Sequence, residues 1–405
     1  MNLVFVGVGG AGCKLANRLY NNKTGDTYKR QCVFIDFDVA SLEETYSGKD
    51  KNVLFPDIKS SSSGAGRSRI RAQYEYDSNR WEELIIDTID DLKLDDETAV
   101  FVLYSASGGT GSGIGPLVAG VFARKVSNPV TTVIALHNTQ DGQVGLVNTK
   151  MALSEHKFRG NNTVMLIRPT ISLKDIDELN EIFDDEFWTY IQLGHTRYID
   201  HRDILTSFKS KGAVTLMRLI KDEKSEGGIR QSTSAFYIPG GFGKDDFENI
   251  GLYKLGIVSD TELIDEEIAA KYPTNSSKVV KDSIDIIGND GEVIAGHISI
   301  SAIPTELYMD KVLNEIDIAI GKSGDINYIV ASILNTSITG INSEEVNVMD
   351  PITRKLFEGS VSMVTKLSDE HSRLEAERVD KFMEESDLDL MDMFSHMGSE
   401  DVNMV

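Results

Sequence analysis

A glycine-rich turn between an apolar run and a helix-like stretch constrains this chain more than any other feature. The turn is Ser-Gly-Gly-Thr-Gly-Ser-Gly at 107–113; the apolar run 99–104 precedes it, and the helix-like stretch 114–126 follows. A helix that starts in such a turn offers free backbone N–H groups and its positive dipole end to an anion. A flexible linker is not expected between a buried strand and a helix. The segment therefore predicts a phosphate-binding turn.

The turn differs from the lysine-containing phosphate loop of many nucleotide-binding proteins. That loop has a glycine separated by four residues from Gly-Lys-Ser/Thr. The Gly-Lys-Ser of this chain lies at 321–323, and Ile316 occupies the position that needs the glycine. Any nucleotide site must therefore rest on another pattern.

A second glycine-rich turn lies near the start of the chain. Residues 7–12, Gly-Val-Gly-Gly-Ala-Gly, follow the apolar run 3–6, and Asp36 and Asp38 come at the end of the next strand-like run. This combination matches the dinucleotide-binding fingerprint, in which glycine lets a diphosphate approach the backbone and an acid binds the ribose. The two carboxylates could also place a nucleotide-bound Mg²⁺ through water, or simply cap the strand end. Taken alone, the pattern predicts NAD binding.

Residues 1–171 alternate short β-branched runs with helix-like stretches. The strand candidates are 3–6, 32–37, 100–104, 130–136 and 164–167, and the helix candidates are 13–20, 80–92, 114–126 and 147–158. Such alternation predicts an α/β, Rossmann-like fold with a parallel sheet covered by helices on both faces. Ligands of these folds bind at the carboxyl ends of the strands, where both glycine turns lie.

The remaining sequence predicts four more segments. The first is 172–204, with a long central helix at 172–194 and the loop after it. The second is a smaller α/β domain at 205–350. A C-terminal helix at 351–385 and an acidic tail without Lys or Arg at 386–405 follow. Within this part we expect a helix at 202–220, a loop at 221–231, strands at 234–238, 279–287 and 298–303, and a hairpin turn at 289–291. The tail could dock on a partner or serve only as a solvated end.

The composition argues against several classes of protein. With 41 Lys and Arg against 64 Asp and Glu, the net charge is −23. We therefore expect no direct DNA binding by the bulk surface, and the basic stretch 67–71 is too small for that role. Two cysteines, and seven histidines without ligand spacing, predict neither a disulfide framework nor a protein-bound metal. No apolar run approaches the roughly 20 residues of a membrane span, so we expect a cytoplasmic protein without a membrane partner.

Together, the two glycine turns resemble the tubulin/FtsZ superfamily of GTPases. In that family both turns hold the phosphates of GTP, whereas a dinucleotide-binding enzyme needs one. The segment 36–38, Asp-Phe-Asp, lies where FtsZ-like proteins have Asn-Thr-Asp, and the segment 64–66, Gly-Ala-Gly, resembles the loop that senses the γ-phosphate. The resemblance implies that residues 1–171 form a GTPase domain that binds GTP or GDP with Mg²⁺.

The resemblance also implies contacts to the sugar and the base. Asp141 lies in a segment that resembles the sugar-contacting loop, where the family usually has Glu, and Val-Asn-Thr at 147–149 follows. Asn180 matches the asparagine that pairs with guanine, since its carboxamide can both donate and accept. At the position of the aromatic residue that stacks on the base, this chain has Ile176. A solvated helix residue is the other interpretation of Asn180.

A last motif implies a role for the neighbouring subunit. Residues 198–203, Tyr-Ile-Asp-His-Arg-Asp, resemble the family's Asn-x-Asp-x-x-Asp/Glu loop, with Tyr198 in place of the usual Asn. In the family this loop reaches the nucleotide of the next subunit and orients a water opposite the γ-phosphate. Asp200 and Asp203 are therefore the candidate catalytic residues; helix N-capping by the same carboxylates is compatible with that role.

The complete set of candidate residues follows from these motifs. The expected nucleotide contacts are Gly9, Gly10, Ala11, Gly12, Cys13, Asp36, Asp38, Gly64, Ala65, Gly66, Ser107, Gly108, Gly109, Thr110, Gly111, Ser112, Asp141 and Asn180.

On this resemblance the chain is a GTPase that polymerises head to tail into dynamic filaments. The C-terminal helix and acidic tail resemble plasmid and phage tubulins of the TubZ and PhuZ type, while 141–142 and 176–182 resemble archaeal CetZ proteins. The first branch implies positioning of plasmid or phage DNA, with the tail on an adaptor or a neighbouring subunit, in the host cytoplasm if the protein is phage-encoded. The second implies a role in cell shape.

Two other functions stay open at this point. An NAD-dependent oxidoreductase would use the turn at 7–12 with Asp36 and Asp38, but it has no need of the turn at 107–113. A nucleotide-binding regulator that never assembles would keep both turns. Comparing NAD with GTP binding tests the first alternative, and hydrolysis in dilute solution tests the second.

Overall fold

The structure is a computed structural model of the whole chain. It describes residues 1–37, 42, 52–58, 65, 68–136, 142–159, 163–168, 173–221, 229–231, 234–237, 252–258, 276–281, 286–287 and 293–322. The predicted C-terminal helix at 351–385 and the acidic tail at 386–405 lie outside these residues.

The described residues contain one mixed sheet of twelve strands. Its order is β10-β9-β12-β7-β6-β5-β4-β1-β2-β3, with β8 paired to β7 and β11 to β12. The strands are β1 (Asn2–Val8), β2 (Lys29–Ile35), β3 (Val53–Leu54), β4 (Thr98–Ser105), β5 (Val130–Ala135), β6 (Thr163–Ile167), β7 (Ala213–Lys221), β8 (Ile229–Gln231), β9 (Tyr253–Val258), β10 (Ser276–Lys281), β11 (Ile286–Ile287) and β12 (Val293–Ile303). Strands β1 to β6 pair in parallel, as the alternation of strands and helices predicts.

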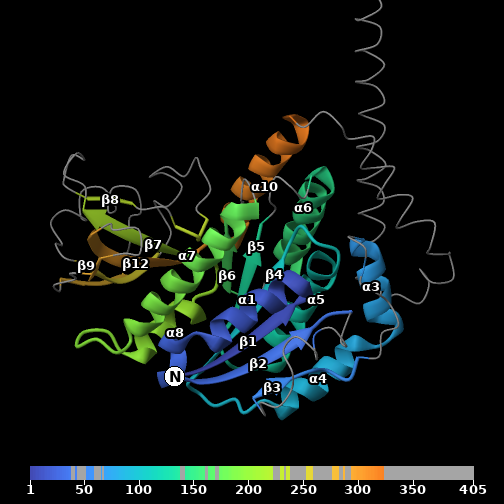
Figure 1. Cartoon of the computed structure of the whole chain (residues 1–405), viewed down its shortest axis with the longest axis horizontal. Helices are drawn as coiled ribbons and strands as arrows, with labels where there is room; N and C mark the ends of the chain where they lie inside the picture. Colours follow the sequence, from blue (N-terminus) through green and yellow to red (C-terminus); the bar gives the residue numbers. More distant parts are fainter. Residues whose placement is uncertain are drawn as a thin grey trace, which may run out of the picture.

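Helices cover both faces of this sheet (Figure 1). Those described are α1 (Gly9–Asn21), α3 (Arg69–Ser78), α4 (Trp81–Asp91), α5 (Thr110–Lys125), α6 (Gly142–Arg159), α7 (Leu173–Gln192), α8 (His201–Lys209) and α10 (Thr305–Lys322), with a 3-10 turn, η1, at Lys23–Thr27. None of them is long and apolar enough to span a membrane.

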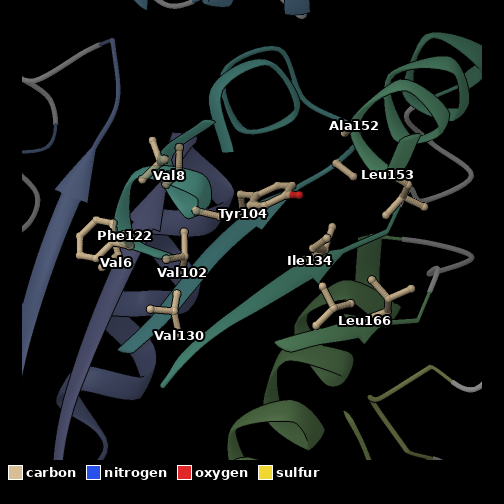
Figure 2. Packing of buried hydrophobic residues seen from close by; sticks show 14 of the residues in the cluster. Val6, Val8, Val102, Tyr104, Phe122, Val130, Ile134, Ala152, Leu153 and Leu166 are labelled. Atoms are coloured by element: carbon tan, nitrogen blue, oxygen red, sulfur yellow. The ribbon is translucent and has the colours of Figure 1, made fainter. Parts of the chain in front are cut away.

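Two hydrophobic cores form because each central strand alternates its side chains between the faces. In β1, Leu3 and Phe5 pack with α1, α7 and α8. Val6 and its alternate neighbours pack instead with α3, α4, α5, α6 and α10. Figure 2 shows part of this second core, where Tyr104 of β4 and Phe122 of α5 are buried. The central strands are apolar on both faces, as expected for a covered parallel sheet.

The first half of the chain confirms the predicted strands and helices with small changes at their ends. It also contains α3, which the sequence pattern does not predict. The central helix predicted at 172–194 is confirmed as α7, and it buries Phe183, Phe187 and Ile191 against the sheet.

The helix predicted at 202–220 is wrong beyond residue 209. Helix α8 ends at Lys209, Gly212 adopts a φ of +126°, and the chain continues as strand β7 from Ala213. Leu, Met and Arg in this run have high helix propensity. The run is nevertheless a strand, because its pairing with β12 outweighs local propensity.

Other predicted elements of the second half are also changed. Strand β8 lies within the predicted loop 221–231. Of the strand predicted at 279–287, residues 279–281 end β10 and residues 286–287 form β11, while 282–285 lie outside the described residues. Residues 234–237 form no strand; they contribute a single bridge between Phe236 and Ile167. β11 and β12 pair antiparallel on either side of 289–291, whose own conformation lies outside the described residues. The sheet continues from β6 to β7 through one parallel pair, Val164 with Ala213.

Candidate functional site

Both glycine turns lie at the carboxyl edge of the sheet, side by side. Strands β1 and β4 are parallel neighbours, with Val8 opposite Tyr104 at their ends. Helix α1 begins at Gly9 directly after β1, and α5 begins at Thr110 after the short turn that follows β4. The register of the strands thus brings together two helix N-termini that are a hundred residues apart in the sequence.

The two turns touch through their backbones. Gly9 has a φ of +71°, and a Cβ atom there would lie 2.8 Å from the backbone N of Gly111. A Cβ on Gly111 would in turn lie 2.7 Å from the carbonyl oxygen of Ser105. Both contacts are closer than real Cβ atoms make. Glycine is therefore required at these positions for the turns to meet.

The turns leave backbone donors for a ligand. Neither α1, with N-cap Val8, nor α5, with N-cap Gly109, has a side-chain hydrogen bond at its cap. A Cβ on Gly108 would meet no atom within 4 Å, so the outer side of this turn is open. Uncapped N–H groups beside open space fit the oxygens of a phosphate chain.

The polar side chains of the turn at 107–113 stabilise it from within. Ser112 Oγ donates to the carbonyl oxygens of Gly108 and Gly109. Ser107 Oγ lies 3.1 Å from Ser105 Oγ. Thr110 is buried in the first turn of α5. The hydroxyl groups of Ser107 and Ser112 thus bond within or beside the turn and fix its shape, and the backbone N–H groups are left for a ligand.

Asn148 also supports this turn from helix α6, a role that sequence reasoning missed. Its Nδ2 donates to the carbonyl oxygens of Ser107 and Gly108, each at 3.2 Å, and the residue is buried. With the carbonyl groups held toward α6, the opposite side of the turn faces outward. In the sequence, the Val-Asn-Thr segment at 147–149 resembles only part of a sugar-contacting loop.

The turn at 7–12 presents Gly10 and Ala11 to solvent, whereas Gly12 and Cys13 face inward. A Cβ on Gly12 would lie 2.2 Å from the carbonyl oxygen of Leu103, so α1 rests directly on β4. The Cys13 thiol donates to Gly7 O, and burial raises its pKa far above the usual range for a thiol. Cys13 can therefore offer a ligand its backbone but not its side chain.

Asp36 lies at the end of β2, beside the turn at 7–12. Its Oδ1 accepts from the backbone N–H of Phe37 at 2.7 Å, and its Oδ2 lies 3.7 Å from where a Gly10 Cβ would be. The structure thus brings one of the two predicted acids to the edge of the turn; Asp38 lies outside the described residues.

Other candidates are only partly described. Gly64, Gly66 and Asp141 lie outside the described residues. Ala65 is buried, and its carbonyl oxygen accepts from the backbone N–H of Ser68, the N-cap of α3. Asn180 is half-buried on α7, one helical turn after Ile176 and on the same side of the helix.

Asp200 and Asp203 form a capping box at the start of α8. Asp200 Oδ1 accepts from the backbone N–H of Arg202 and Asp203, and Asp203 Oδ2 accepts from the backbone N–H of Asp200 at 2.9 Å. The capping interpretation is confirmed. Asp200 remains exposed and Asp203 is half-buried, so both stay partly open to solvent while the box fixes their orientation.

This carboxylate pair lies at the amino edge of the sheet, opposite the glycine turns. Helix α7 runs back across the sheet for 20 residues, about 30 Å of helix. At the start of α8, the rings of His195 and His201 lie 5.1 and 5.6 Å from that of Tyr28, the residue before β2. Figure 1 shows α8 beside the N-terminus of the chain. The carboxylates therefore cannot reach a ligand at the glycine turns of the same chain.

Comparisons with known proteins show what the first part of the chain is similar to. Residues 2–167 match the model of the Tubulin/FtsZ family, GTPase domain. No curated protein matches the sequence.

The fold is similar to that of several solved structures. TubZ of Clostridium botulinum phage c-st has 15% identity and a TM-score of 0.59 over 79% of this chain and 98% of that chain. CetZ of Methanosaeta thermophila has 16% identity and a TM-score of 0.53 over 98% and 99%. TubZ of Bacillus thuringiensis serovar israelensis, in a GTPγS-form protofilament, has 13% identity and a TM-score of 0.55 over 80% and 93%. Residues 2–167 of this chain, with both glycine turns, therefore match the GTPase domain of the tubulin/FtsZ family.

Proposed function

We propose that this protein polymerises head to tail and hydrolyses GTP between its subunits. One observation carries the proposal: the glycine turns and the Asp200–Asp203 pair lie at opposite edges of one sheet. A surface that meets a different surface of the next copy produces a filament unless the rotation closes a ring. Stacked in this way, the carboxylates of one subunit meet the glycine turns of its neighbour.

In the proposed site each group has a defined task. The turns at 7–12 and 107–113 bind the phosphates through backbone N–H groups, and Asp36 contacts the ribose or a water of bound Mg²⁺. Asn180 pairs with guanine, and Asp141 with a ribose hydroxyl. Asp200 and Asp203 of the next subunit orient the attacking water. Bound Mg²⁺ would neutralise charge on the phosphates, and the protein's part is mainly positioning and charge stabilisation.

Solved structures of similar fold support assembly. The Bacillus thuringiensis TubZ structure is a GTPγS-form protofilament, and so is that of CetZ2 from Haloferax volcanii, which has a TM-score of 0.54 and 15% identity over 79% of this chain. If copies of this chain stack with the same polarity, the glycine turns of one copy meet Asp200 and Asp203 of the next.

Asp200→Asn tests the proposal without loss of the helix cap, since Asn caps a helix as well as Asp. We expect the variant to pellet with GTP as the wild type does, with hydrolysis slowed at least tenfold, because the attacking water loses a charged partner. Ultracentrifugation and phosphate release measure the two effects. Asp87→Asn, an exposed acid on α4, is the control. Absence of any GTP-dependent polymer of the wild type would overturn the proposal.

We further propose that the filaments position plasmid or phage DNA, with the acidic tail on a DNA-bound adaptor or on the next subunit. The lack of Lys and Arg in 386–405 supports a basic partner for the tail. A CetZ-like role in cell shape is the second candidate, supported by the similar fold of CetZ. Deleting the residues after Glu385 distinguishes the two proposed roles of the tail. Loss of assembly would indicate that the tail binds the next subunit, and unchanged assembly would indicate that it is available to an adaptor.

A further inference from the structure

His201, the first residue of α8, packs against three residues at the amino edge of the sheet. The centre of its ring lies 4.5 Å from that of His195, with the two planes at 81°, and 5.6 Å from the ring centre of Tyr28. A Cβ on Gly194 would lie 2.5 Å from Cδ2 of His201, so glycine leaves room there for the ring. Tyr28, Gly194 and His195 thus form a cage around His201.

This cage adjoins the two candidate catalytic carboxylates. Asp200 directly precedes His201 and forms an isolated β-bridge with His195. The carboxylates of Asp200 and Asp203 make the capping box at the start of α8, whose first residue is His201. A displacement of the His201 ring therefore moves the start of the helix, and with it the orientation of both carboxylates.

The cage suits the neutral form of the ring. Nε2 of His201 is buried and has no hydrogen-bond partner within the part of the chain that the structure describes. A neutral imidazole can leave this nitrogen without a proton, whereas a protonated ring would bury an N–H group that lacks an acceptor. A positive ring would also lie at the positive end of the α8 dipole.

The charged groups around the ring act on the same equilibrium. Burial lowers the pKa of His201 below its ordinary value, and the N-terminal amine and His195 lower it further, whereas the carboxylates of Glu97 and Asp200 oppose the shift. The amine lies 3.7 Å from Oε2 of Glu97, so these two charges partly offset each other. The stability that the neutral ring contributes is complete above the ordinary histidine pKa of about 6.5, and it is lost as pH falls through the lower pKa of the folded protein.

We propose that His201 is a positioning residue that holds Asp200 and Asp203 in place for hydrolysis while its ring is neutral and releases them when the ring is protonated. The inference rests on the proposed function, in which these carboxylates orient the attacking water at the GTP of the neighbouring subunit. Hydrolysis, and through it the lifetime of the filament, then becomes sensitive to acid.

Two substitutions test this role by GTP hydrolysis per polymerised subunit, measured at pH 7.5 and pH 5. His201→Phe keeps an aromatic ring that cannot take up a proton. We expect the ratio of the rates at the two pH values to be at least about threefold larger for the wild type than for this variant, because titrations common to both proteins cancel. His201→Ala empties the cage and should slow hydrolysis at pH 7.5 by at least about fivefold. Thr206→Ala, which truncates an exposed side chain of the same helix, is the control and keeps the wild-type rate and ratio.

A second measurement follows the ring itself in the full chain bound to GDP. The histidine Cε1–H signal that disappears in His201→Phe belongs to His201, and we expect it to titrate below the ordinary value of about 6.5 in nuclear magnetic resonance spectra. A pKa of His201 at or above that value would overturn the inference.

The inference would also be overturned by equal pH ratios in the wild type and His201→Phe, or by a wild-type rate in His201→Ala. A wild type that neither assembles nor hydrolyses GTP at pH 7.5 would instead overturn the proposed function, so the two failures are distinguishable. If His201→Ala does not fold, the pH ratio of His201→Phe decides.

Discussion

At the scale of single residues, the glycines of the two turns do different work. The backbone of β4 packs directly against Gly12 and leaves no space for a side chain, whereas Gly108 faces open space. Packing therefore requires glycine at position 12, whereas the open space beside Gly108 is where we propose that a phosphate binds. In the sequence alone, both residues are simply glycines of glycine-rich turns.

Paired alanine substitutions separate these roles. Gly12→Ala places a Cβ 2.2 Å from the Leu103 carbonyl oxygen, so we expect it to lower the free energy of unfolding by roughly 2–4 kcal/mol or to prevent folding. Gly108→Ala should change this free energy by less than about 0.5 kcal/mol yet weaken GDP binding. Urea unfolding and a fluorescent GDP titration measure the two effects. Equal loss of stability in both variants would contradict this division.

At the scale of helices and strands, the sequence predicts the parallel half of the sheet well, because β-branched apolar runs and glycine turns mark each strand. It fails where residues far away in the sequence determine the local structure. The run 213–221 has the composition of a helix, but β12, some eighty residues later, pairs with it. Helix α3 shows only weak amphipathic pattern; Gly113, Arg69 and Glu155 hold it in place. The support of the phosphate turn by Asn148 is likewise invisible without the contact.

The central helix α7 carries a buried acid that should make stability depend on pH. Glu186 accepts from Ser234 Oγ and the backbone N–H of Ala235, each at 2.9 Å, and burial raises its pKa to about 8, although these bonds and Arg218 oppose the shift. The folded protein thus keeps a proton that the unfolded chain releases near its ordinary pKa. This contribution to stability is complete below the unfolded pKa and is lost as pH rises through about 8.

Glu186→Gln removes this pH-dependent loss of stability and keeps an oxygen that accepts both hydrogen bonds. Between pH 6 and 8 we expect the wild type to lose stability relative to the variant by up to about 1.4 kcal/mol per pH unit. Urea unfolding at three pH values measures the difference, with Glu181→Gln, an exposed acid of the same helix, as control. Parallel pH profiles of wild type and Glu186→Gln would show that the carboxyl is ionised in the folded protein.

At the scale of the whole molecule, the proposed function depends on two groups of residues that the sheet holds apart. A single-chain active site would need its groups at one edge, whereas here α7 carries the chain from the carboxyl to the amino edge before Asp200. The net charge of −23 adds a cost to stacking, since like-charged subunits repel. Salt screens that repulsion, so assembly should be favoured by moderate ionic strength.

A shared active site predicts that two inactive variants restore each other. Asp200→Asn keeps the glycine turns but lacks the charged partner, and Gly108→Leu fills the open space beside the turn but keeps both acids. In an equal mixture, about one contact in four joins intact turns to an intact Asp200, if subunits stack at random. We therefore expect phosphate release from the mixture to exceed clearly the sum of the separate variants. Replacing Gly108→Leu by the double variant Asp200→Asn/Gly108→Leu removes the intact acid, and the gain must vanish. A site contained within one chain gives no gain in either mixture, because neither variant then holds both halves.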